Sequence, residues 1–175
     1  MTDPAGTSVH ASAVLVGDRA VLIRGPSGAG KSRLAFDLIL AARAGQIQTA
    51  LLVGDDRVIL EATQNRLIVR PASALAGLIE IRGLGIRRCD CAPEAIVGLV
   101  VDLCAEDAER LPPPQALRTT IAGVELARIP VKADYSPLPL VVASLTTIDG
   151  CAPVRHLSDC SKGIGNHIWP TIATK

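Results

Sequence analysis

Apolar residues occur in short runs that are separated by polar turns, and the period of these runs changes along the chain. Two runs, Ala13–Val16 and Ala20–Ile23, flank the turn pair Gly17-Asp18, which predicts two strands joined by a tight turn. After a glycine-rich stretch, apolar residues recur at helical spacing and predict a helix over Lys31–Arg43. The chain therefore begins with strand, strand, loop and helix.

The rest of the chain predicts more strands than helices. We expect strands at Thr49–Val53, Val58–Leu60, Arg66–Val69, Leu78–Ile81 and Ile96–Leu103, a hairpin within Arg118–Ile129, and a helix at Pro139–Thr147. Residues 1–9 are small and polar and are expected to fray, and Cys104–Pro114 is expected to be a loop. The order of elements predicts an α/β domain with a mixed sheet over residues 1–149, followed by an irregular tail at 150–175.

Composition narrows the class of protein. The 18 basic and 17 acidic residues leave a net charge of +1, and only three residues are aromatic, so nucleic-acid binding is disfavoured as the main activity. The five cysteines form no Cys-x-x-Cys pair, which favours reduced thiols. Neither a basic-then-apolar leader nor an apolar run long enough to span a bilayer is present. These features predict a soluble cytoplasmic protein with no membrane partner.

One segment fits the pattern Gly-x-x-x-x-Gly-Lys-Ser/Thr at every fixed position: Gly25-Pro26-Ser27-Gly28-Ala29-Gly30-Lys31-Ser32. Glycines let successive backbone N–H groups turn toward phosphate oxygens, and the start of the following helix adds its positive end. In this pattern Lys31 would reach the β- and γ-phosphates, and the Ser32 hydroxyl would bind Mg²⁺. The segment thus predicts a nucleotide site; the alternative is a glycine turn that only joins a strand to a helix.

Two acidic residues follow the next predicted strand. Asp55 and Asp56 come directly after an apolar run, as in a Walker-B motif, where one carboxylate holds Mg²⁺ directly or through water. The second carboxylate could act as a base toward a hydroxyl group. The alternative is a solvated turn, in which Asp is common.

Two further constellations stand near these motifs. His10 precedes the first strand, and antiparallel pairing of the first two strands would return it to the phosphate loop; the alternative is a surface histidine with no role. Glu80 and Arg82 share one face of a short strand that runs into the glycines of Gly83-Leu84-Gly85, expected to form a pliant loop. They could supply a metal ligand and a charge clamp, or belong to a surface hairpin.

Together these motifs resemble the C-terminal catalytic domain of the HPr kinase/phosphorylase family. His10, the phosphate loop, the Asp-Asp pair and the segment Glu-Ile-Arg-Gly-Leu-Gly-Ile at 80–86 match in order, and the last of these is the distinctive signature. The resemblance covers roughly residues 8–104 and is closest to the short form found in alphaproteobacteria. It implies an α/β P-loop fold of the HPr kinase/PEP carboxykinase-like type.

The resemblance also implies roles for individual residues. Residues 25–32 would bind the phosphates of ATP, with Lys31 as the catalytic lysine and Ser32 as a Mg²⁺ ligand. Asp56 would take the proton from a substrate serine, Asp55 would support the metal, Glu80 would be a second metal ligand, and His10 and Arg82 would lie at the catalytic site. Arg33 stands where the family carries an acidic residue, and no Pro-Gly-Arg-Asn-type loop, which the family uses in dephosphorylation, follows; residues 130–134 are the nearest region.

The function implied is an ATP-dependent serine kinase acting on an HPr-type phosphocarrier protein, which can also remove the phosphate by phosphorolysis. Members of the family form hexamers, so a homo-oligomer is expected. Two alternatives stay open: a small-molecule P-loop kinase, and a nucleotide-sensing regulatory protein with weak turnover.

Overall fold

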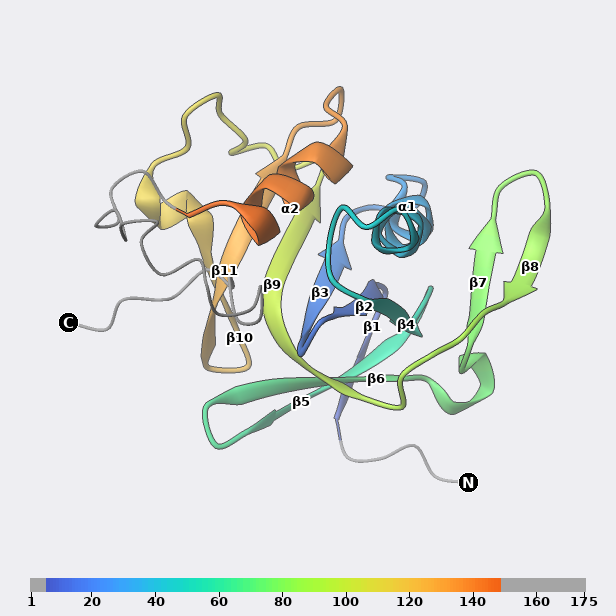
Figure 1. Cartoon of the computed structure of the whole chain (residues 1–175). Helices are drawn as coiled ribbons and strands as arrows, with labels where there is room; N and C mark the ends of the chain where they lie inside the picture. The colour runs from blue at the N-terminus through green and yellow to red at the C-terminus, as the bar shows by residue number, and fades with distance from the viewer. Residues whose placement is uncertain (1–5, 149–175) are drawn as a thin grey trace, which may run out of the picture.

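A curled, mixed β-sheet organises the chain, with both helices on one of its faces (Figure 1). The computed structural model describes residues 6–148. Its strands are β1 (Thr7–Val9), β2 (Ser12–Val16), β3 (Arg19–Arg24), β4 (Ala50–Gly54), β5 (Val58–Thr63), β6 (Arg66–Pro71), β7 (Leu78–Ile81), β8 (Gly85–Arg88), β9 (Ala95–Leu103), β10 (Arg118–Ile121) and β11 (Val124–Val131). The helices are α1 (Lys31–Arg43) and α2 (Pro137–Thr146), and short 3₁₀ turns lie at Ser73–Leu75 and Pro114–Leu117.

The long strand β9 lies at the centre of the sheet. It pairs in parallel with β3 on one side and with β11 on the other, and antiparallel with β6 near its own start. A strand buried on both faces needs a nearly continuous apolar sequence, and β9 reads Ala-Ile-Val-Gly-Leu-Val-Val-Asp-Leu. The order of strands along the sheet is β1-β5-β6-β9-β3-β2-β4, and β10 pairs with β11 beside β9.

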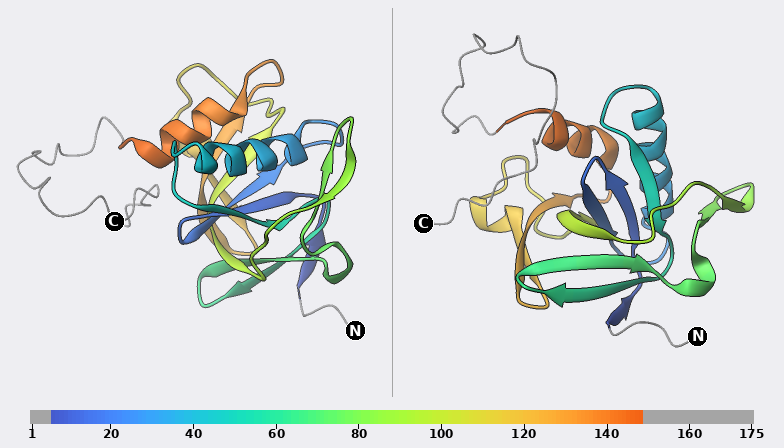
Figure 2. Two further views of the ribbon diagram at one scale, coloured as in Figure 1. Left: turned by 45° about the vertical axis from the view of Figure 1, so that its right-hand side comes forward. Right: turned by 60° about the horizontal axis from the view of Figure 1, so that its bottom comes forward.

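Two apolar clusters fill the two sides of the sheet. On the helix side, Leu34 and Leu38 of α1 pack with Val21, Ile23 and Val101 of the central strands. On the opposite side, alternate residues of the same strands pack against β5 and β6 where the sheet curls over (Figure 2). The aliphatic alternation along β3 therefore serves both sides, and the strand leaves this double core directly into the glycine-rich loop.

The α/β class with a mixed sheet is confirmed, as is the helix over Lys31–Arg43. The fraying expected for residues 1–9 is wrong for Thr7–Val9, which pairs with β5 through backbone hydrogen bonds that small polar side chains do not reveal. The segment expected to be a pliant loop at 83–85 is a tight turn, because Leu84 N–H bonds the Ile81 carbonyl at 2.9 Å and β8 follows at once. The expected tail at 150–175 lies outside the described residues.

The second helix begins at Pro137, two residues before the expected start at Pro139. Proline is favourable in the first turn of a helix because its missing N–H would be unpaired there, so either proline could begin it. Among residues 6–148, no helix is long and apolar enough to cross a membrane.

Candidate functional site: a phosphate loop beside a buried carboxylate

The glycine-rich loop connects β3 to α1, as its sequence predicts. Gly30 caps the helix with φ of 95°, a left-handed value that glycine adopts without strain. Gly25 has φ of 149°, and a Cβ at this position would lie 3.0 Å from both Cβ and the carbonyl oxygen of Leu103. The start of the loop is therefore packed against the end of β9, and only glycine fits there.

Lys31 is the buried cation of the loop. The residue is 6% exposed, and its Nζ donates hydrogen bonds to the carbonyls of Gly25 at 3.0 Å and of Pro26 at 2.9 Å. Burial lowers the pKa of Lys31, while the charges of Asp55 and Asp56 oppose that shift. The ammonium thus lies inside the loop and within the electrostatic reach of both carboxylates.

Asp55 directly follows β4 and is 3% exposed, so its carboxylate needs polar partners. Ser12 Oγ donates to Asp55 Oδ1 at 2.5 Å, and the backbone N–H of Glu80 donates to Asp55 Oδ2 at 3.0 Å. Three segments that are distant in sequence therefore meet at one carboxylate, and both of its oxygens are oriented.

Asp56, the next residue, is exposed, whereas Asp55 is buried. Its side chain is 63% exposed, and its backbone has φ of 64°. His10 Nδ1 lies 2.9 Å from the Asp56 carbonyl oxygen and 3.2 Å from Asp56 Oδ1. A carbonyl oxygen only accepts, so Nδ1–H is the donor, and His10 holds Asp56 in its left-handed conformation with the carboxylate open to solvent.

The structure brings together most of the residues that the sequence singles out. His10 contacts Asp56, and the charges of Asp55 and Asp56 act on Lys31. Glu80 joins through its backbone, with an exposed side chain. Arg82 is exposed in the turn after β7 and makes no hydrogen bond or ion pair with another described residue, so no contact places it at the loop.

Arg33 points away from this cluster. Its side chain is 86% exposed and pairs with Asp37 one helical turn later at 3.7 Å. Ser32 occupies the first turn of α1 beside it but is only partly exposed. The arginine that follows Ser32 in sequence is therefore directed along the outer surface of α1 and not toward the loop.

Sequence reasoning missed Ser12. It is fully buried in β2, where a serine among apolar residues gives only one signal, namely that a buried hydroxyl requires a partner. Its partner lies 43 residues later, so the pairing depends on how β2 and β4 lie side by side.

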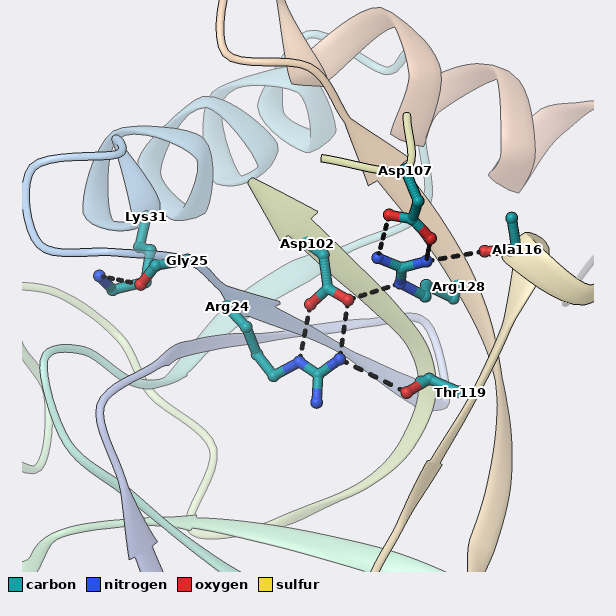
Figure 3. Close-up of polar contacts among 8 residues, drawn as sticks. All are labelled: Arg24, Gly25, Lys31, Asp102, Asp107, Ala116, Thr119 and Arg128. Atoms are coloured by element: carbon teal, nitrogen blue, oxygen red, sulfur yellow. Dashed lines mark hydrogen bonds and ion pairs between the residues drawn. The ribbon is translucent and has the colours of Figure 1, made fainter. Parts of the chain in front are cut away.

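Sequence reasoning also missed an ion network near the carboxyl ends of β3, β9 and β11 (Figure 3). Arg24, the residue before the phosphate loop, makes two hydrogen bonds of 2.7 Å to the Asp102 carboxylate, and Arg128 Nε donates to Asp102 Oδ2 at 2.6 Å. Arg128 also holds Asp107 and the Ala116 carbonyl. Burial opposes ionisation of Asp102, but the two arginines outweigh it and lower the pKa of Asp102.

The donor set can be tested against a magnesium ion. No group of three or more His, Cys, Asp or Glu residues within 6–148 is arranged to hold a metal. Mg²⁺ at nucleotide sites, however, takes only one or two protein ligands and completes its shell with phosphate oxygens and water. The hydroxyl of Ser32 and the carboxylates of Asp55 and Glu80 fit that kind of site and do not fit a cage made of protein ligands alone.

Comparison with known proteins agrees with this geometry. Residues 4–133 match the family model described as the HPr Serine kinase C-terminal domain. An HPr kinase/phosphorylase of Mycoplasma mycoides is 44% identical over 77 residues, which is 44% of this chain and 22% of that protein. One of Enterococcus faecalis is 41% identical over 81 residues, or 46% of this chain and 24% of that protein. The matches thus span about a quarter of these relatives.

A solved structure extends the likeness to the fold. The Hpr(Ser) kinase/phosphatase from Coxiella burnetii superposes with a TM-score of 0.62 at 28% sequence identity, over 79% of this chain and 93% of that one. The structural likeness therefore covers a larger share of the chain than the sequence match to the two relatives above. With a phosphate loop, an Asp-Asp pair and a matching family model over most of its length, the chain belongs to the HPr serine kinase C-terminal domain family.

Proposed function

We propose that this protein is an ATP-dependent serine kinase that acts on an HPr-type phosphocarrier protein. The observation that carries the proposal is the position of Lys31, buried in the phosphate loop and within the electrostatic reach of Asp55 and Asp56. A cation that holds phosphates, beside one buried and one exposed carboxylate, is suited to transferring a phosphoryl group to a hydroxyl. The relatives named HPr kinase/phosphorylase supply the substrate class.

In this proposal, residues 25–32 bind the ATP phosphates. Backbone N–H groups of the loop and the start of α1 face the phosphate oxygens, and Lys31 Nζ exchanges the Gly25 and Pro26 carbonyls for them. Ser32, Asp55 and Glu80 would hold Mg²⁺, which supplies charge neutralisation at the β- and γ-phosphates when bound. Ser12 and the Glu80 N–H keep the Asp55 carboxylate in one orientation.

Asp56 is the proposed base. Its exposed carboxylate accepts the proton of the substrate serine, the serine oxygen forms a bond to the γ-phosphorus, and the bond from that phosphorus to the ADP oxygen breaks. His10 positions Asp56 through the carbonyl and the carboxylate. In dephosphorylation, an oxygen of inorganic phosphate would form a bond to the phosphorus of phosphoserine, the bond from that phosphorus to the serine oxygen would break, and Asp56 would act as the acid that protonates the leaving serine oxygen, with release of pyrophosphate. Arg82 would add charge stabilisation only after the hairpin that carries it closes on the substrate.

The wider proposal is a cytoplasmic homo-oligomer, hexameric as the family resemblance implies, with a catalytic domain over residues 1–149. It is tested by incubating the protein with labelled ATP, Mg²⁺ and a purified HPr-type protein, then locating the label by mass spectrometry. We expect label on a serine of the carrier, and release of pyrophosphate when inorganic phosphate is added to the phosphorylated carrier. ATP binding without any serine phosphorylation contradicts the kinase and supports a nucleotide sensor.

A further inference from the structure

The hairpin β7–β8 projects from the body of the molecule. It forms a separate two-stranded sheet, in which β7 contacts α1 and the tip extends away from the body in the right view of Figure 2. Ile79 of β7 is 1% exposed and packs in the helix-side core, so the first strand anchors the hairpin. Its base is tied to the candidate site, because the Glu80 N–H bonds Asp55.

The outer strand of this hairpin is left uncovered. Every residue from 82 to 88 is exposed, and β8 pairs with β7 alone among the described strands. Leu84 at the tip and Ile86 in β8 are each 63% exposed. Such an arm presents two large apolar side chains and an unpaired strand edge, features that proteins normally cover unless a partner uses them.

The charge of the arm has one sign. Arg82, Arg87 and Arg88 form no ion pair with another described residue, and Glu80 is the only acidic residue between 78 and 88. In β7–β8, Ile86 lies opposite Glu80 and Arg88 lies opposite Leu78, so Ile86 and Arg88 share with Glu80 the face that points away from Ile79. Arg87 lies opposite Ile79 and belongs to the other face. Exposed apolar and basic side chains therefore alternate along β8.

We propose that the hairpin arm, Arg82 to Arg88, is a docking surface for the phosphoryl-acceptor protein, and that it binds an apolar patch of that protein bordered by acidic residues. This inference rests on the proposed kinase function. A protein hydroxyl must be held next to the phosphate loop while it is phosphorylated, and β7, which carries the arm, is joined to the Asp55 carboxylate of the candidate site by the Glu80 N–H bond. Unpaired arginines favour an acidic partner, and Leu84 and Ile86 give it apolar area to bury.

The test separates acceptor binding from nucleotide binding. Two double variants alter the arm and spare Arg82: Leu84→Ala with Ile86→Ala, and Arg87→Glu with Arg88→Glu. For each, calorimetry with an HPr-type protein gives the acceptor Kd without ATP, and a fluorescent ATP analogue gives the nucleotide Kd. We expect the acceptor Kd to rise at least about thirtyfold, the effect of losing a single interface hot spot, and the nucleotide Kd to stay unchanged.

The loop before β10 offers a matched control. Leu111 is 84% exposed and is preceded by the exposed Arg110, a similar apolar and basic pair. The segment before β10, yellow in Figure 1, lies across the molecule from β7–β8. Leu111→Ala with Arg110→Glu should leave the acceptor Kd unchanged. Equal unfolding midpoints for parent and variants show that the substitutions act on binding and not on folding.

Steady-state transfer gives an independent readout. The arm variants should raise the KM for the acceptor while kcat at saturation is kept, because the four substituted residues hold the acceptor and Arg82, which has the proposed role at the phosphoryl group, is unchanged. An unchanged acceptor Kd in both arm variants overturns the docking proposal, as does a change in sedimentation coefficient, which assigns the arm to contact between copies of this chain. A parent protein that binds the acceptor but transfers no phosphate contradicts the kinase and leaves the docking surface supported.

Discussion

The hydroxyl of Ser12 donates a 2.5 Å hydrogen bond to Asp55, and both residues are buried where β2 and β4 lie side by side. The two residues are 43 positions apart. The bond orients the Asp55 carboxylate of the candidate site from inside the core.

Replacing Ser12 should therefore impair the site as well as the fold. Ser12→Ala leaves Asp55 Oδ1 without its buried donor, and we expect a loss of about 1–3 kcal/mol in the free energy of unfolding. The rate of phosphoryl transfer should fall with it. In an Asp55→Ala background, Ser12→Ala should lower the free energy of unfolding and the transfer rate much less. Urea unfolding and kcat measure this double-mutant cycle. Full additivity would show that Ser12 acts independently of Asp55.

Lys31→Met removes the cation of the phosphate loop at nearly constant length. Hydrogen bonds to charged groups contribute about 1.5–3 kcal/mol, so nucleotide affinity should fall roughly tenfold to a hundredfold in a fluorescence titration. The matched control is Arg33→Met, because that side chain is 86% exposed and pairs only with Asp37. The control should keep the parental nucleotide affinity, and a comparable loss there would place Arg33 at the phosphates.

Asp56→Asn separates binding from transfer. Asparagine tolerates the left-handed backbone that Asp56 adopts with φ of 64°, so the substitution removes the charge without straining the turn. We expect nucleotide affinity to be kept and kcat for serine phosphorylation to fall at least about a hundredfold, the usual contribution of a general base. Parental turnover in Asp56→Asn would exclude this residue as the base.

The Asp102 carboxylate should make the free energy of unfolding depend on pH. Arg24 and Arg128 lower its pKa below the usual 3.8, so its stabilising contribution is complete above that value and is lost as the pH falls through the lower, folded-state pKa. Asp102→Asn leaves the two arginines with a weaker, uncharged partner. It should lower the free energy of unfolding by roughly 3 kcal/mol near neutral pH.

Urea unfolding of parent and Asp102→Asn proteins between pH 2 and 7, roughly the window in which a carboxylate titrates, checks this expectation. The difference in unfolding free energy between the two proteins should be constant above about pH 5 and shrink toward acid. A difference that does not change with pH would mean that the Asp102 charge is not what stabilises the ends of β3, β9 and β11.

Local patterns in the sequence predicted the elements that depend on near neighbours. The helix over Lys31–Arg43 has the expected ends because a glycine loop precedes it and its apolar residues keep a helical period. The glycine-rich loop between β3 and α1 was predictable for the same reason, since its eight residues are consecutive. The β1 strand was not, because its stability comes from pairing with β5, some fifty residues away.

The residues of the candidate site also differ in whether a local pattern reveals them. Lys31, Asp55 and Asp56 are recognisable from short motifs, and His10 and Glu80 from their places around these motifs. Ser12 and Asp102 have no motif: the first is one hydroxyl in an apolar strand, and the second is one acid at the end of another. Their importance lies in partners supplied by other strands, and a single sequence carries no record of those distances.

What the sequence by itself determined is therefore which groups are present: a glycine-rich loop that ends in Lys31, an adjacent pair of acids after an apolar strand, and a family signature at 80–86. The tertiary structure decided how these groups are arranged. It buried Asp55 against Ser12 and the Glu80 N–H, left Asp56 open beside His10, turned Arg33 outward, and raised the signature into an exposed arm. The reason is physical: burial and strand pairing join residues that are far apart along the chain, and those contacts set which carboxylate is held in the core and which is open to solvent.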